Sequence, residues 1–201
     1  MLVSNGQVFS HKLVVFADGT LASLALQSSI IQYLWTAKWC STLESRLVFT
    51  PSDVFETFPR PGSTARMRVA GAALERDRRA FMMGRQLGLT KTYNLVHDPA
   101  VADVEVAHLR GLHAEIDEAV CAAYGWGDLP LDHGHHDTRQ GVRWTVSAAA
   151  RVELLDRLLE LNHARFAAEQ APGRDGAVTG RPDVPQPRRP AGPSRVPLRA
   201  P

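Results

Sequence analysis

The sequence is poor in cysteine and in long apolar runs. Its 201 residues contain two cysteines, Cys40 and Cys121, which are 81 positions apart. This spacing indicates neither a disulfide framework nor a metal knuckle, so we expect two free thiols in a reducing cytoplasm. No apolar run approaches the roughly 18 residues of a membrane-spanning helix. The first residues also lack the basic and apolar regions of a signal peptide. We therefore expect neither a secreted disulfide scaffold nor a membrane protein.

Lysine is scarce as well, because only Lys12, Lys38 and Lys91 occur. A nuclease of the Asp…Glu-x-Lys type needs clustered carboxylates and a lysine for metal-assisted hydrolysis, and no such cluster is visible. No glycine-rich loop follows a predicted strand, so nothing indicates a cradle for a nucleotide cofactor. The sequence therefore predicts no catalytic and no cofactor-binding residues in this chain.

Charge is distributed unevenly along the chain. Residues 38–91 hold ten Lys and Arg against five Asp and Glu, a net charge of +5. Residues 92–170 hold six against thirteen, a net charge of −7. Residues 171–201 carry a net +4, eight prolines and no aromatic residue, a composition that predicts a disordered tail. The basic zone can face phosphate and the acidic zone is repelled by it, although solvated helix faces produce the same bias.

Hydrophobic periodicity predicts an α+β chain that is mainly α. Residues 21–39 carry apolar side chains at spacings of three, four and seven, which predicts one well-buried helix. Gly88 and Gly125 are expected to end the helices before them, and the last two helices should form an antiparallel pair. The expected elements are strands at 12–17, 47–50 and 142–146, a helical turn capped by Ser52 or Asp53 and running to Phe58, a loop at 90–99, and helices at 21–39, 72–87, 103–124 and 147–169.

Histidine and aspartate are concentrated in residues 132–137, which read Asp-His-Gly-His-His-Asp. Such side chains can bind metal, but a site needs several of them to converge, and adjacent histidines point in different directions. Pro130 and Gly134 indicate an exposed loop, so we expect a solvated connector and no metal site. His108 and His113 are expected on the surface of the helix at 103–124.

Five stretches of the chain carry a recognisable pattern when they are taken in order. They are FADGTLASLALQSS at 16–29, STLESRL and FTPSDVFETFPRP within 41–61, RQLGLTKTYNLVHDP at 85–99, LRGLHAEIDEAVCAAYGW at 109–126, and TRQGVRWTVSAAARVELLDRLLELNHARF at 138–166. Together they resemble the C-terminal part of MmeI-like type IIG and type IIL restriction-modification adenine methylases. The similarity covers the end of the target recognition domain and the helical domain that follows it, over roughly residues 12–169.

The resemblance implies three parts: the closing edge of a recognition domain at 1–61, a small helical domain at 62–170, and the tail at 171–201. Full-length members bind S-adenosylmethionine and grip a flipped adenine with an Asn/Asp-Pro-Pro-Tyr/Phe motif. This sequence has only Asp98-Pro99, followed by an alanine. We therefore expect a fragment or separate specificity piece that is not catalytic by itself and needs no cofactor.

Four cations are predicted to contact DNA: Lys38, Arg46, Arg60 and Lys91. The expected partner is double-stranded DNA, with a methylase domain as a further partner and no membrane. Two alternatives stay open. The chain can instead be a structural or protein-interaction module that docks through its acidic faces, or a metal hydrolase built on residues 132–137.

Overall fold

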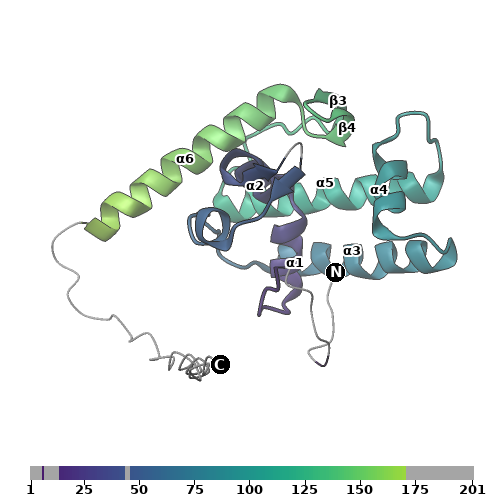
Figure 1. Ribbon diagram of the computed structural model, residues 1–201, viewed down its shortest axis with the longest axis horizontal. Helices are drawn as coiled ribbons and strands as arrows, with labels where there is room; N and C mark the ends of the chain where they lie inside the picture. The colour runs from purple at the N-terminus through teal and green to yellow at the C-terminus, as the bar shows by residue number, and fades with distance from the viewer. Residues whose placement is uncertain (1–5, 7–13, 44–45, 171–201) are drawn as a thin grey trace, which may run out of the picture.

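The computed structural model describes residue 6 and residues 14–43 and 46–170, and for residues 41–43 and 46–48 it describes the backbone only. The tail at 171–201 lies outside the described residues. Helices dominate, and two small antiparallel sheets accompany them, which confirms the predicted α+β, mainly α class (Figure 1). The elements are α1 Leu21–Ser28, α2 Ile30–Trp39, β1 Ser41–Leu43, β2 Arg46–Val48, the π-helix η1 Pro51–Phe55, α3 Ala65–Gly84, α4 Leu89–His97, α5 Val104–Tyr124, β3 Gly134–Thr138, β4 Gly141–Thr145 and α6 Ala148–Gln170.

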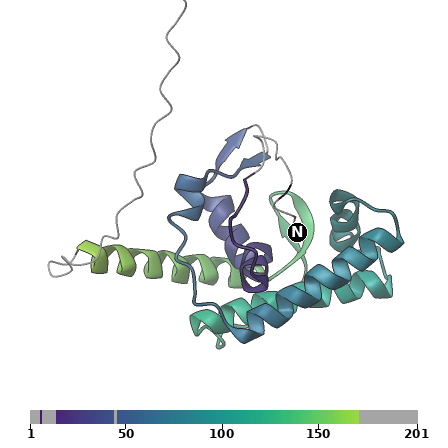
Figure 2. The same ribbon diagram turned by 90° about the horizontal axis from the view of Figure 1, so that it is seen from below.

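The helices α3 and α5 run alongside each other and form the frame of the fold (Figure 2). Helix α5 begins where the sequence predicts, because the Asp103 carboxylate accepts hydrogen bonds from the first turn of backbone N–H groups. It ends at Gly125, whose φ of 81° lies in the left-handed region that glycine adopts without a steric penalty. Cap chemistry thus fixes both ends of this helix.

The prediction of one helix at 21–39 is wrong in one respect, because the segment forms two helices, α1 and α2. Ser29 has extended backbone angles of −80° and 155°, and its hydroxyl accepts a hydrogen bond from Gln32 N at the start of α2. The same hydroxyl donates to Leu26 O at 2.7 Å, and the Ile30 N–H donates to the buried Asp117 at 2.8 Å. A serine that caps the next helix, together with a carboxylate from α5, breaks the helix without interrupting its apolar pattern.

Helix α1 crosses α3 at very close range. A methyl group at Gly71 would lie 2.0 Å from the carbonyl oxygen of Leu21, so only glycine permits this approach. The core around the crossing is one cluster that includes Trp35, Leu74 and Ile116. It contains residues from both sides of position 61, and the division of the chain at 61 stays a prediction.

Helix boundaries between 61 and 99 differ from the predicted ones. Helix α3 begins at Ala65, capped by Thr64, and it ends at Gly84 rather than near residue 87. Gly88 is not the residue that ends it; with a φ of −78° it is the N-cap of α4. The predicted loop at 90–99 is therefore mostly the helix α4. Threonine and asparagine are weak helix formers, but burial of Thr92 and Val96 overrides that preference.

The short elements near the N-terminus also need correction. Of the strand predicted at 12–17, residues 12–13 lie outside the described part and residues 14–17 form no strand. Phe16 instead packs on Phe49 and Phe55, with ring centroids 5.7 and 5.1 Å from its own. The strand expected at 47–50 is β2, which pairs with β1. The predicted helical turn is present as η1, but its N-cap is Thr50, not Ser52 or Asp53.

The strand predicted at 142–146 is confirmed as β4, and it pairs with β3. Helix α6 begins after Ser147 as predicted. Its buried residues are Ala150, Leu154 and Leu158, whereas Val152 and Phe166 are exposed. It packs on α2, so the predicted pairing of the last two helices is wrong: α5 pairs with α3. Within the part of the chain that the structure describes, no helix is long and apolar enough to cross a membrane.

Candidate nucleic-acid interface

We call residues 49–61, FTPSDVFETFPRP, the signature segment. Its apolar residues are anchored in the core, where Val54 and Phe58 are buried. The Trp35 indole of α2 packs on the Phe58 ring at 6.0 Å and donates a hydrogen bond to Thr57 Oγ1 at 3.1 Å. The Thr57 hydroxyl in turn donates a hydrogen bond to Asp53 O at 2.6 Å. Phe58 and Thr57 therefore attach the signature segment to α2.

Three side chains from elsewhere bind the backbone of the signature segment. Tyr124 at the end of α5 donates to Pro59 O at 3.0 Å. Asn162 and Arg165 of α6 donate to the carbonyls of residues 57 and 60, at 2.7 and 2.9 Å. The segment thus joins α2, α5 and α6, and these bonds fix the position of Arg60 at its end.

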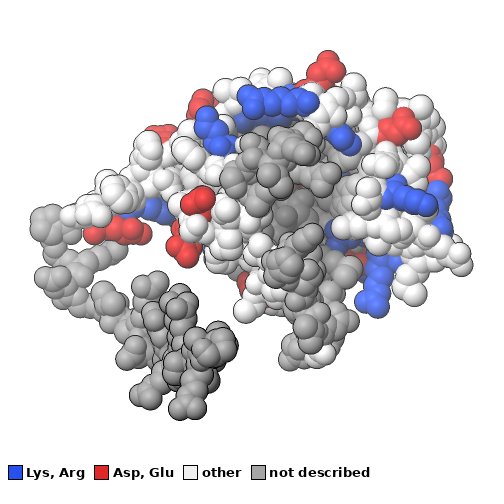
Figure 3. Space-filling model, in the orientation of Figure 1, with Lys and Arg blue, Asp and Glu red and all other residues white. Residues whose placement is uncertain are grey.

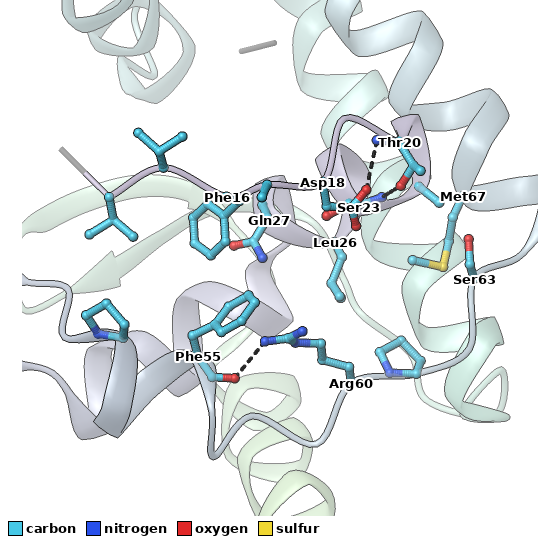
Figure 4. A pocket seen from close by; sticks show the side chains of 16 residues that line it. Phe16, Asp18, Thr20, Ser23, Leu26, Gln27, Phe55, Arg60, Ser63 and Met67 are labelled. Carbon is cyan, nitrogen blue, oxygen red and sulfur yellow. Dashed lines mark hydrogen bonds between the residues drawn. The ribbon is translucent and has the colours of Figure 1, made fainter. Parts of the chain in front are cut away.

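Arg60 lies at the edge of a cleft of about 470 Å³ between α1, η1 and residues 14–18. Its side chain extends toward Phe55, with the guanidinium carbon 3.3 Å from the ring centroid and a 2.8 Å hydrogen bond to Phe55 O (Figure 4). Burial lowers the pKa of Arg60, and the nearby Asp18 carboxylate opposes that shift. The remaining walls are largely apolar and include Phe16, Leu26 and Met67. The cleft offers one cation and one carboxylate among aromatic and aliphatic side chains.

The other predicted DNA contacts lie on separate elements. Lys38 is exposed in the last turn of α2, and Lys91 is exposed in the first turn of α4. Arg46 belongs to β2, and its side chain lies outside the described part. Helices α2 and α4 are well apart in both ribbon views (Figures 1 and 2). The structure therefore places Lys38 near the signature segment and Lys91 away from it.

The basic and acidic zones of the sequence face each other across the α3–α5 contact. Arg66 forms an ion pair with Glu118 at 2.8 Å, and Arg85 pairs with Asp103 at 2.8 Å and with Glu105. On the face shown in Figure 3, Lys and Arg lie in several separate patches with Asp and Glu between them. Several arginines of the basic zone at 38–91, which was expected to face phosphate, therefore pair with carboxylates of the same chain.

Two cations that sequence reasoning missed stay exposed on α3. Arg68 and Arg79 form no ion pair with any residue that the structure describes. They are eleven residues apart, which is close to three helical turns, so they lie on the same side of the helix about 16 Å apart along its axis. Arg68 precedes the helix predicted at 72–87, so that prediction could not place the two arginines on one side of a helix. They add two exposed cations to the four predicted residues.

The histidines of residues 132–137 are less exposed than predicted, because the segment forms β3 instead of a solvated connector. His133 is hydrogen-bonded to the buried Asp117 at 3.0 Å. The pKa of Asp117 is raised, because the effect of burial exceeds the opposing effect of the hydrogen bond with His133. Among the residues with a described position, no group of three or more His, Cys, Asp or Glu could hold a metal ion.

The two histidines of α5 differ from each other. His108 is exposed, as predicted, and pairs with Asp77 at 2.9 Å. His113 is not a surface histidine: its Nε2 lies 2.8 Å from the Tyr93 hydroxyl, and burial lowers its pKa to about 4. It stays neutral at pH 7.

Comparison with known proteins gives little. No protein-family model matches the chain, and no curated protein matches it. Among solved structures, it is similar to the type IIL restriction-modification enzyme MmeI, determined in complex with DNA, at a TM-score of 0.46 and 20% sequence identity. The match covers 73% of this chain but only 16% of the MmeI chain.

Proposed function

We propose that this chain is a DNA-contacting, non-catalytic part of a restriction-modification adenine methyltransferase. The observation that carries the proposal is the ordered set of segments in residues 12–169, with the signature segment at its centre. Target recognition in such a system requires cations that bind backbone phosphates and polar side chains that reach base edges. Binding of S-adenosylmethionine and methyl transfer would belong to other parts of such an enzyme.

The contacts of the signature segment support this proposal. Phe58 and Thr57 contact Trp35 of α2, while side chains of α5 and α6 bind the backbone carbonyls of the segment. Arg165 binds the Arg60 carbonyl, and the Arg60 guanidinium contacts Phe55 beside the cleft. Lys38 is exposed on α2, the helix that packs on the same segment. A pre-positioned cation binds phosphate with less loss of side-chain freedom than a mobile one.

Salt-dependent binding to duplex DNA tests the proposal. Each phosphate that the protein neutralises contributes about −0.9 to the slope of log affinity against log salt. Affinity for a fluorescent duplex would be measured by anisotropy at several salt concentrations. Lys38→Gln and Lys91→Gln should each reduce the magnitude of the slope by about 0.9.

Arg66→Gln is the matched control, because it removes the same charge from the same zone. Arg66 is already paired with Glu118, so its loss should change the slope less than the loss of either lysine. A wild-type slope near zero would contradict DNA contact. A control that changes the slope as much as the two lysine variants would show that net charge alone is responsible.

One observation favours a second candidate, a protein-interaction module. The last turns of α6, residues 163–170, are exposed throughout, and that end of the helix projects from the body (Figure 1). Phe166 lies there and is 61% exposed. If a methylase domain covers this end, Phe166→Ser should weaken association with that domain in sedimentation experiments and leave the unfolding midpoint unchanged. Equal association of both proteins would exclude α6 as the contact.

A further inference from the structure

A cluster of hydrogen-bond donors lies between the C-terminal end of α4 and the β3–β4 hairpin. His135 and Trp144 are directly paired across the hairpin, and their rings meet edge to face at 5.2 Å. The guanidinium of Arg110, from α5, lies 5.6 Å from the centre of the Trp144 ring. His97 is the last residue of α4 and lies close enough to Arg143, His135 and Arg110 for their charges to affect its titration.

Four buried polar atoms in this cluster have no hydrogen-bond partner among the described residues. They are His97 Nδ1, His135 Nε2, Arg143 Nε and Trp144 Nε1. The arginine and tryptophan atoms can only donate, and each imidazole atom donates in one of its two tautomers. Leaving such donors buried without an acceptor is costly, so a bound group that accepts from them would stabilise the arrangement.

The electrostatics of the cluster favour a negatively charged acceptor. Arg110 and Arg143 are both cationic, whereas the carboxylate that acts on His135 is the exposed Asp98, which is already bound to Ala100 N at 2.9 Å. The donors of Arg110 are used by the carbonyls of α4 and the following loop, so it supplies charge rather than free hydrogen bonds. Burial and the nearby cations lower the pKa of His97 to about 4, which keeps this imidazole neutral at pH 7.

We propose that His97, His135, Arg143 and Trp144 form a binding site for a phosphate-type oxyanion. Several oxygens on one anion can accept from several N–H groups, and the two guanidinium charges balance the anion. The phosphate can come from solution or from a nucleic-acid backbone. The site lies on the α4 side of the molecule, apart from the signature segment, and does not depend on the function proposed above.

Titration of the full chain with inorganic phosphate, followed by NMR of the indole N–H groups, tests the site. The Trp144→Phe variant identifies the Trp144 signal and also removes one donor while keeping an aromatic ring. We expect that signal to shift and saturate with phosphate but not with chloride at equal ionic strength. Isothermal titration should show that Trp144→Phe and Arg143→Gln each weaken phosphate binding about tenfold, the equivalent of one charged hydrogen bond.

Trp126→Phe is the matched control, because Trp126 stacks on Tyr124 at 4.3 Å near the other end of α5. It should leave phosphate affinity unchanged. Absence of saturable binding at millimolar phosphate, or equal affinity in all variants, would overturn the proposal. If Trp144→Phe fails to fold by circular dichroism, the wild-type indole shift and Arg143→Gln decide. Competition by a short DNA duplex would identify a backbone phosphate as the source, and phosphate binding without competition would identify a free oxyanion.

Discussion

Arg110 stabilises the C-terminal end of α4, and its replacement should destabilise the fold there. It lies in α5 and is almost fully buried, although it carries a charge and pairs with no carboxylate of the residues that the structure describes. Its guanidinium instead donates to four carbonyls at the end of α4 and in the following loop, those of residues 95, 96, 98 and 101, at 2.7 to 3.3 Å. The cation also faces the negative end of the α4 dipole. Arg110 therefore closes α4 in the way that a C-terminal cap does.

Arg110→Met keeps the length of the side chain and removes all of these donors. A hydrogen bond from a charged donor contributes about 1.5–3 kcal/mol, but some of the freed carbonyls will regain water. We therefore expect a loss of about 3 kcal/mol in the free energy of unfolding, or a fall of about 6–12 °C in Tm for a chain of this size.

Urea denaturation followed by circular dichroism measures this loss, and an unchanged slope m shows that the comparison is valid. Arg110→Lys is the control, since it keeps the charge but cannot reach four carbonyls with one ammonium group. It should fall between the wild type and the methionine variant. A loss below about 1 kcal/mol for Arg110→Met would refute the claim that these bonds hold α4 in place.

Two further predictions concern the helices. Gly71→Ala should destabilise the protein by several kcal/mol in urea denaturation, because the added methyl would lie 2.0 Å from Leu21 O, whereas Gly84→Ala in the same helix meets nothing within 4 Å and should cost nothing. His113 has a pKa of about 4 in the folded chain, below its unfolded value of about 6.5, so its contribution is complete above pH 6.5 and is lost as the pH falls toward 4. The free energy of unfolding should therefore fall by up to about 1.4 kcal/mol per pH unit in that window, and His113→Gln, measured in parallel, should show a shallower decline; an identical decline would contradict the assignment to His113.

Local signals in the sequence predicted the elements that depend on local chemistry. The Asp103 cap and Gly125 define α5, and the alternation in residues 142–146 defines β4. The break at Ser29 was missed because it depends on Asp117, which is 87 positions away from the Ile30 N–H that it binds. Helix α4 was missed for a similar reason, since Arg110 and burial stabilise a segment with weak helix propensity.

The candidate site was only partly predictable. The signature segment is recognisable by its residues, but nothing in it indicates that its carbonyls bind Tyr124, Asn162 and Arg165. Regional charge counting predicted a basic surface, yet it could not show that Arg66 and Arg85 face carboxylates of α5. A count of charges along the sequence does not show which side chains form ion pairs. The packing of α3 on α5 determines those pairs.

The proposed contact with DNA rests on a small set of cations. It is tested by comparing the salt dependence of duplex binding for the wild type and for a variant in which Lys38, Arg46, Arg60 and Lys91 are all replaced by Gln. We expect a wild-type log–log slope between about −3 and −4 and a slope close to zero for the variant. If the variant keeps the wild-type slope, other residues bind the phosphates and the proposed contact is wrong.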